Sequence, residues 1–518
     1  MSTAPPSQGP AGLTRQRFLR KLGVGAAGAV AVGSGVLTAP EAAEAERTRG
    51  DRFGRLFGDL PPFRENSEAL RTALREIGRP GGMLDAHDAL ERGPIDLIVD
   101  PALSVNNPNN PTHTAGTTFM GQFMDHDMTF DTTSRLAQPT NPRSAPNSRT
   151  PSFDVDSVYG GGPAVSPQLY DRSDPVKLMV ESGGLFEDLP RTTDNTAIIG
   201  DPRNDENLVI AGLHAAFLLF HNNAVDLVRS EGYSDPDEVF ARARRLLTWH
   251  YHWLIVREFL PLFVGQNMID AILSLGRRVY RPNGEAFIPV EFQGAAYRFG
   301  HSMVRPSYRA NLAGDAGGPF FAMIFDPAEF GQPDPDDLTG GHRAPRRFIG
   351  WQTFFAFDAE VKPNKRIDTR ISTPLFQLPA SAIAGTEGTP TALAQRNLLR
   401  QITWGIPSGQ DIARRLDVDR LERRDLQELE PFGLGLDGST PLWFYVLKEA
   451  EVMEDGLHLG PVGGTIVAEV IIGLLQLDRA SFLSVQPNWQ PTLPNRGGEF
   501  RMVDFLTFAG VDPEARGQ

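Results

Sequence analysis

The segment Gly121-Gln122-Phe123-Met124-Asp125-His126-Asp127 places one histidine between two carboxylates. Neighbouring residues of an α-helix lie about 100° apart around the helix axis. On a helix, Asp125 and Asp127 would therefore point to nearly opposite sides, so that His126 could serve one site while Asp127 serves another. The alternative is a solvent-exposed Asp-His-Asp run that has no function.

A second group of oxygen-bearing side chains lies in the loop that leads into Val158-Tyr159-Gly160. It contains Asp154 and Asp156, two residues apart, in a stretch rich in threonine and serine that begins at Thr150. Hard oxygen ligands of this kind are those that Ca²⁺ prefers. The alternative is an acidic pair that only forms a turn.

Two further segments carry arginine and histidine. Arg203–Asn207 leads into a helical stretch with His214 and His221, which are seven residues apart and hence too far apart for one zinc ion. We expect those two histidines to be structural. His301, within Tyr297–Met303, is flanked by glycine and aromatic residues, which is compatible with a buried metal ligand or with a packed core histidine.

Composition excludes several classes of function. The chain has 518 residues and a net charge of −14, which argues against nucleic acid or an anionic membrane surface as the main partner. It has no cysteine, so disulfides, a disulfide-linked dimer, thiolate ligands and iron–sulfur clusters are impossible. A transition metal must rely on the 10 histidines and on carboxylates.

The N-terminus resembles a secretory signal. Basic residues 14–21 precede the uncharged stretch Leu22–Ala39, and Ala43-Glu44-Ala45 offers a cleavage site. We therefore predict an export signal over residues 1–45, similar to a twin-arginine signal except that Gln16 replaces the second arginine, and a periplasmic or secreted protein. A disordered tail or a membrane anchor is the alternative; no second apolar run is expected to span a bilayer.

The remainder, 46–518, is predicted to be one large, mainly α domain with little β structure. Asp235 as N-cap and Pro236 at the first helical position mark a helix start, and residues 208–228 have helical length. Residues 46–100 are expected to wrap around the larger body. Loops are expected where proline, asparagine and small polar residues gather, at 106–118, 138–151 and 332–346.

In this order, the segments resemble motifs of the animal-type haem peroxidase family, in the peroxidase–cyclooxygenase superfamily, and suggest a bacterial-type member. The resemblance rests on 121–127, on Val158-Tyr159-Gly160, on Arg203-x-x-Glu206-Asn207, on Arg298-Phe299-Gly300-His301-Ser302 and on Asn397-x-x-Arg400. It spans about residues 80–440. It implies the family's mainly α fold and a haem cofactor.

The resemblance also implies roles at the haem iron. His301 would be the proximal ligand, and Asn397 would accept a hydrogen bond from the other nitrogen of its imidazole. On the distal side, His126 would carry a proton between the two oxygens of H₂O₂, Arg203 would stabilise charge, and Gln122 would hold water or a halide.

Other residues would hold the haem itself. Asp125 and Glu206 match carboxylates that form ester bonds to haem methyl groups, and Arg298 and Arg400 are candidates for the propionates. Thr129 stands where the family has an acid near a propionate.

A bound Ca²⁺ is also implied. Its ligands would be Asp127, Thr150, Ser152 through its carbonyl, Asp154 and Asp156.

The implied reaction is that of a peroxidase. Hydrogen peroxide would be reduced by two electrons, and a halide, a pseudohalide or a small aromatic donor would be oxidised through a ferryl and porphyrin-radical intermediate. Two alternatives remain. One is a fatty-acid dioxygenase, although Tyr251-His252-Trp253 lies far before His301 in the chain. The other is an exported adhesion protein that uses the fold as a binding module.

Overall fold

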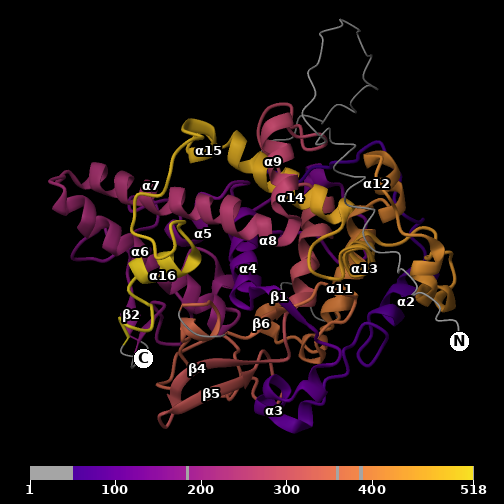
Figure 1. Cartoon of the computed structure of the whole chain (residues 1–518), viewed down its shortest axis with the longest axis horizontal. Helices are drawn as coiled ribbons and strands as arrows, with labels where there is room; N and C mark the ends of the chain where they lie inside the picture. Colours follow the sequence, from indigo (N-terminus) through magenta and orange to yellow (C-terminus); the bar gives the residue numbers. More distant parts are fainter. Residues whose placement is uncertain (1–50, 183–185, 358–360, 384–388, 517–518) are drawn as a thin grey trace, which may run out of the picture.

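The computed structural model describes residues 51–182, 186–357, 361–383 and 389–516. The predicted export signal, 1–45, lies outside the described residues. Helices dominate the molecule, as predicted (Figure 1). Their bounds are α2 Glu68–Ile77, α3 Gly93–Val99, α4 Gly116–Met128, α5 Asp156–Tyr159, α6 Leu208–Ser230, α7 Pro236–Leu254, α8 Leu260–Val264, α9 Gln266–Leu275, α10 Val290–Gln293, α11 Leu393–Trp404, α12 Gly409–Leu416, α13 Leu442–Glu454, α14 Pro461–Leu477, α15 Phe482–Val485 and α16 Met502–Phe508.

The β structure consists of short antiparallel pairs. They are β1 Asn109–Thr114 with β6 Pro363–Lys365, β2 Glu181–Ser182 with β3 Glu187–Asp188, and β4 Ser307–Asp315 with β5 Gly318–Met323. The prediction of a loop over 106–118 was wrong, because β1 and the start of α4 lie there. Its polar, proline-containing sequence pairs with a strand some 250 residues away (Asn110 with Asn364), a partner that local composition cannot reveal.

Helices α6 and α7 pack side by side at the left of Figure 1. As predicted, Pro236 begins α7, and the Asp235 side chain accepts a hydrogen bond from the Glu238 amide at 2.9 Å. Asn207 caps α6 in the same way. Contrary to expectation, α6 is long and apolar enough to cross a membrane, but 83% of its most apolar window is buried inside the protein. It is therefore a core helix.

Helix α4 lies at the centre of the molecule, against α6, the 3₁₀ turn Pro202–Asp205 and the 3₁₀ segment Ala296–Met303. A methyl group at Gly121 would lie 3.1 Å from the Phe259 ring, so the small residue permits a close approach to the π-helical turn Ile255–Phe259. The Tyr297 hydroxyl donates to the Gly121 carbonyl at 3.0 Å. These contacts fix α4 relative to the segment that carries His301.

The N-terminal stretch contacts the body along its length. Gly54 donates to the Ile288 carbonyl at 3.1 Å and accepts from the Val290 amide at 2.9 Å, while α2 packs on α11. The buried apolar side chains form a core cluster that runs from Phe53 to Val511. The first and last described segments thus share one core with the central helices.

Buried His250 fastens the C-terminal segment to α7. Its Nδ1 donates to the Leu246 carbonyl at 2.7 Å, and its Nε2 accepts from the amides of Thr492 and Leu493 at 3.2 and 3.3 Å. The Nε2 contacts require the neutral imidazole, because a protonated ring has no acceptor. Burial lowers the pKa of His250 to about 4.

We expect His250→Gln to weaken the acid sensitivity of folding. The folded pKa lies below the unfolded value of about 6.5, so between these values the unfolded chain binds the extra proton and stability falls as the pH falls. Urea unfolding at pH 7 and pH 5 measures the effect: the loss of stability between the two is smaller in the variant. An equal loss in both proteins would show that His250 does not contribute.

Candidate active site

A cavity at the centre of the molecule collects all the residues predicted to contact haem. It is lined from α4, from the 3₁₀ turn before α6, from the segment that carries His301 and from α11. The predicted residues in its wall are Gln122, Asp125, His126, Arg203, Glu206, Arg298, His301, Asn397 and Arg400. Segments up to some 280 residues apart in sequence therefore meet at one site.

His126 is buried, and its protonation is fixed by two neighbours. Asn204 Oδ1 lies 2.8 Å from His126 Nδ1, and Asn204 Nδ2 lies 2.9 Å from Nδ1 of His214. Because the amide nitrogen donates to His214, the amide oxygen accepts from His126, which leaves His126 Nε2 as a base. Burial and the charge of Arg203 lower the pKa of His126 to about 4, so its ring is neutral at pH 7.

The Arg203 side chain is held on several sides at once. Its Nε and Nη2 bind Asp201 at 3.0 and 2.8 Å, and Nη2 also donates to the Thr129 carbonyl at 2.7 Å. The Phe130 ring lies 4.1 Å from its Cζ. Nη1 is directed to Asp125, whose carboxylate lies 3.5 Å away in the cavity wall.

Polar groups continue along the same wall. Gln122 Nε2 donates to Glu206 Oε2 at 3.1 Å, and that oxygen lies 4.0 Å from His126 Nε2. Burial raises the pKa of Glu206 to about 8. Asn207 Nδ2 donates to Gln122 Oε1 at 3.4 Å. Asp125 and Glu206 thus present carboxyl groups to whatever fills the cavity.

His301 lies on the proximal wall. The amide nitrogen of Asn397, Nδ2, lies 2.8 Å from its Nδ1, and Asn397 Oδ1 is buried without a hydrogen-bond partner among the described residues. In this orientation the amide donates to Nδ1. The predicted arrangement, in which the amide oxygen accepts the Nδ1 hydrogen and Nε2 keeps its lone pair, requires the amide to be turned over. Burial, with the charges of Arg298 and Arg400, lowers the pKa of His301 to about 3. A neutral imidazole in this position is suited to bind a metal.

Positive charge accumulates at the α11 side of the cavity. Arg298 and Arg400 lie there as predicted, together with Arg396, which the sequence analysis did not identify. Burial and the charges of Arg400 and Arg396 lower the pKa of Arg298 to about 9. Asp131, also unidentified, faces Arg400 at 3.5 Å. Three guanidinium groups against one carboxylate leave an excess positive charge that suits an anion.

These features fit a haem. A neutral imidazole for the iron, a second neutral imidazole, and guanidinium groups for two propionates all line the same space. Within the described part of the chain, Arg400 Nε and Gln293 Oε1 are buried without hydrogen-bond partners. Buried polar groups of this kind are normally satisfied, so a polar ligand is expected beside them.

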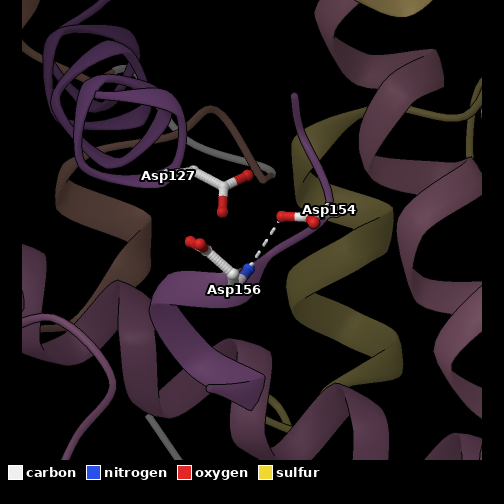
Figure 2. A group of neighbouring side chains, drawn as sticks. All are labelled: Asp127, Asp154 and Asp156. Atoms are coloured by element: carbon white, nitrogen blue, oxygen red, sulfur yellow. Dashed lines mark hydrogen bonds between the residues drawn. The ribbon is translucent and has the colours of Figure 1, made fainter. Parts of the chain in front are cut away.

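Asp127 points away from the cavity, as the helix geometry predicted. It is fully buried and forms an acidic cluster with Asp154 and Asp156, whose closest ligand atoms lie within 4.8 Å of one another (Figure 2). Burial and the other carboxylates raise the pKa of Asp127 well above its ordinary value and that of Asp154 to about 6. An oxygen-only cluster under this repulsion fits a hard cation such as Ca²⁺.

The two other predicted calcium ligands lie on the same loop. The Thr150 amide and hydroxyl contact Asp156 Oδ2 at 3.2 and 3.4 Å, and the Ser152 amide donates to the Thr150 carbonyl at 2.8 Å. The acidic cluster itself consists of the three aspartates. The roles of Thr150 and Ser152 as calcium ligands stay a prediction.

The histidines expected to be structural do make structural contacts. His221 Nδ1 lies 2.9 Å from the Tyr159 hydroxyl, and its Nε2 lies 2.9 Å from the Val176 carbonyl. His214 does more than was expected, because it fixes the amide of Asn204. The sequence signal for Asn204 was only its position next to Arg203, and the signal for Asp131 its position two residues after Thr129.

Comparison with known proteins is consistent with this geometry. The family described as animal haem peroxidase matches residues 132–341. Chorion peroxidase of Aedes aegypti is 27% identical over 173 residues, 30% of this chain and 22% of that protein. Peroxidasin of Drosophila melanogaster is 24% identical over 381 residues, 64% of this chain and 23% of that protein. The chain thus spans less than a quarter of these relatives.

Solved structures share the fold. Peroxidase A from Dictyostelium discoideum matches with a TM-score of 0.56 at 18% identity, over 83% of this chain and 88% of that one. Fatty acid alpha-dioxygenase from Oryza sativa matches with a TM-score of 0.54 at 14% identity, over 84% of this chain and 76% of that one.

We predict that Asn204→Ala lowers the free energy of unfolding by about 1–3 kcal/mol, because it leaves buried groups of His126 and His214 without their partner. Urea denaturation measures this loss. Nitrogen-15 spectra of the imidazoles would show His126 as a single Nδ1-protonated tautomer in the original protein and as a mixture in the variant.

Asn223→Ala is the matched control. Asn223 lies in α6. Its half-buried side chain donates to a single backbone carbonyl, that of Phe508, at 2.9 Å. Its removal should cost less than the removal of Asn204. Equal losses, with an unchanged His126 tautomer, would contradict the proposed orientation by Asn204.

Proposed function

We propose that the chain is a member of the animal haem peroxidase family, whose model matches residues 132–341, and that it is a haem-dependent oxidoreductase that reduces H₂O₂ by two electrons and oxidises a halide, a pseudohalide or a small aromatic donor. The observation that carries the proposal is the pair His126 and His301. Both are neutral, each has its Nδ1 beside an asparagine amide, and both line one cavity.

When bound, the haem supplies the redox chemistry, and the chain supplies ligation and proton transfer. His301 Nε2 would hold the iron. His126 Nε2 would take the proton from one oxygen of H₂O₂ and pass it to the other, which would leave as water, and a bound haem would supply the two electrons that cleavage of the O–O bond requires. Arg203 Nη1 faces the cavity and stabilises the charge that develops on the departing oxygen. Gln122 orients the distal water or halide.

The haem periphery is held by charged groups. Arg298, Arg400 and the newly identified Arg396 bind the propionates. Asp131 replaces the family's acidic residue near a propionate, whose position is occupied here by Thr129. Asp125 and Glu206 would hold the haem through ester bonds to its methyl groups, each bond replacing one methyl C–H bond, with H₂O₂ as the two-electron oxidant. The raised pKa of Glu206 favours a protonated carboxyl group while the cavity is closed to water.

Ca²⁺ at Asp127, Asp154 and Asp156 supports the distal side. Asp127 and His126 are adjacent in α4, so an ion that fixes Asp127 also fixes the rotation of the helix and the direction of His126. Export of the protein, with residues 1–45 as the signal, stays part of the proposal.

Fatty-acid oxygenation is the second candidate. The observation in its favour is Tyr297, an aromatic hydroxyl in the cavity wall, together with the fold shared with alpha-dioxygenase. The Tyr297 hydroxyl, however, is engaged by the Gly121 carbonyl, and Tyr251 is absent from the described cavity wall. Oxygen uptake with linoleate and no added peroxide would favour the dioxygenase over the peroxidase.

The test is an absorption spectrum of the purified protein before and after one equivalent of H₂O₂. We expect a Soret band that shifts with peroxide and returns when bromide, iodide or guaiacol is added. Extraction with acidified acetone should leave the haem attached, and Asp125→Asn combined with Glu206→Gln should release it.

His301→Ala is the control for ligation, and it should abolish the band. His126→Gln should retain the band and lower the rate with peroxide by at least about 100-fold, in the range of lost general acid–base catalysis. A protein that stays colourless and does not bind added haemin would refute the proposal.

A further inference from the structure

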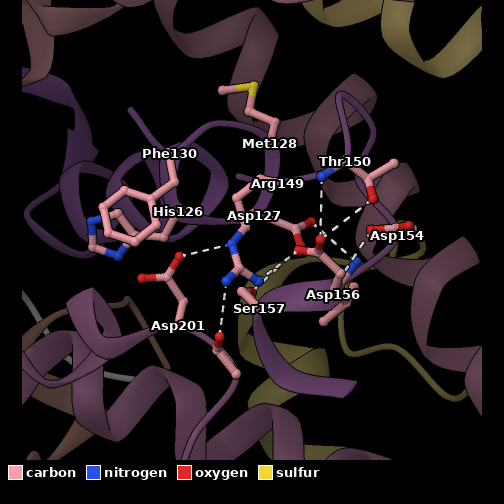
Figure 3. Close-up of polar contacts among 12 residues, drawn as sticks. His126, Asp127, Met128, Phe130, Arg149, Thr150, Asp154, Asp156, Ser157 and Asp201 are labelled. Carbon is pink, nitrogen blue, oxygen red and sulfur yellow. Dashed lines mark hydrogen bonds and ion pairs between the residues drawn. The ribbon is translucent and has the colours of Figure 1, made fainter. Parts of the chain in front are cut away.

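A line of ion pairs leads from the acidic cluster through Arg149 to Asp201 (Figure 3), and from Asp201 on to Arg203 in the cavity wall. Asp156 Oδ1 lies 3.3 Å from Arg149 Nη1, and Arg149 Nε lies 3.1 Å from Asp201 Oδ2. Asp201 then binds the Nε and Nη2 of Arg203 at 3.0 and 2.8 Å. The four side chains alternate in charge, and we refer to them as the ion-pair relay.

The relay is almost closed to water. The side chain of Asp201 is 0% exposed, and those of Arg149, Asp156 and Arg203 are 14, 18 and 16% exposed. Arg149 is fixed further by donating to the Gly200 carbonyl at 2.9 Å. Buried charges that are paired in defined geometry are strongly coupled, because loss of one partner leaves the next one uncompensated.

The relay also accounts for the direction of Arg203. Asp201 occupies two of its nitrogens, and the carbonyls of Thr129 and His126 accept from Nη2 at 2.7 and 3.2 Å. Of the three guanidinium nitrogens, Nη1 is the one left to face the cavity. A shift of Asp201 would therefore turn the group that meets the peroxide.

Charge balance makes the relay sensitive to a cation. A divalent ion on Asp127, Asp154 and Asp156 leaves one net negative charge, which Arg149 neutralises, while Asp201 and Arg203 neutralise each other. Without the ion, the positive charge that offsets the carboxylates of the acidic cluster is lost. These carboxylates then attract Arg149 more strongly and draw it toward Asp156 and away from Asp201.

We propose that Arg149 and Asp201 are positioning residues that transmit occupation of the calcium site to Arg203. This route is separate from the adjacency of Asp127 and His126 in α4, because it runs through side chains of two other segments. The role of Arg203 in it rests on the proposed function, whereas the coupling between Asp201 and the calcium site does not.

The first test needs no haem. Calorimetric titration of the full chain with Ca²⁺ alone compares the original protein, Asp201→Asn, Arg149→Gln and the double variant. Asp201→Asn should weaken calcium binding by about five-fold or more. Without the Asp201 carboxylate, Arg149 pairs with Asp156 only and competes more strongly with Ca²⁺ for that carboxylate. In the Arg149→Gln background, Asp201→Asn should change the calcium affinity by less than about two-fold, because the guanidinium group that joins Asp201 to Asp156 is already absent.

Arg244→Gln is the matched background. Arg244 donates to the Asp154 carbonyl at 3.0 Å on the same loop but contacts neither Asp201 nor Arg203 in the described contacts. Asp201→Asn should act as strongly there as in the original protein. An equal effect of Asp201→Asn in all three backgrounds, or no effect in any, would overturn the relay, because it would leave only a through-space charge effect.

The second test reads the distal side and also covers failure of Asp201→Asn to fold. Cyanide affinity of the haem-loaded protein, followed by the Soret shift, is measured with and without Ca²⁺. Arg149→Lys keeps the charge but cannot bridge two carboxylates as a guanidinium does. The gain in affinity that calcium gives should fall about five-fold in Arg149→Lys and persist in Arg244→Lys.

A calcium effect that is undiminished in Arg149→Lys would overturn the relay. A protein without any Soret band would instead refute the proposed function, and the calorimetric cycle alone would then decide whether Asp201 and Arg149 are coupled to the calcium site.

Discussion

The rigid placement of α4 is the constraint on which the site depends. The helix is buried between α6 and the segment that carries His301, and its successive residues must face different environments. Asp125 faces the cavity and Asp127 faces the acidic cluster, so the position of each fixes the other. Two positions along one rigid helix thus connect the cavity to the acidic cluster, with no flexible joint between them.

An asparagine amide faces a buried histidine on both walls of the cavity. Asn204 on the distal side and Asn397 on the proximal side each contact Nδ1 of a buried histidine. Burial keeps both rings neutral, and the amide atom that faces Nδ1 decides which ring nitrogen carries the hydrogen: Asn204 presents Oδ1, whereas Asn397 presents Nδ2. An amide suits this task because it does not titrate, whereas a carboxylate in the same place would raise the basicity of the ring and add a buried charge.

Charge is distributed unevenly around the cavity, and the pattern follows the expected ligand. Carboxyl groups of Asp125 and Glu206 lie with the distal histidine, whereas Arg298, Arg396 and Arg400 lie near α11. A buried excess of guanidinium groups is costly in an isolated protein, and so is a buried cluster of three aspartates. Binding of the proposed anionic haem and of the proposed divalent cation would lower both costs and would link cofactor binding to folding.

The sequence by itself determined the chemistry-bearing residues and much of the helical framework. The resemblance to family motifs predicted that His126, Arg203 and His301 share one site, and all three line one cavity. Asp235 with Pro236 sufficed for the start of α7, because capping is local. Only the tertiary structure decided that residues 109–114 form a strand, that Asn204 orients His126, and that Arg149 reaches Asp201. Those contacts join segments tens to hundreds of residues apart, and local composition carries no information about which distant partner a side chain will meet.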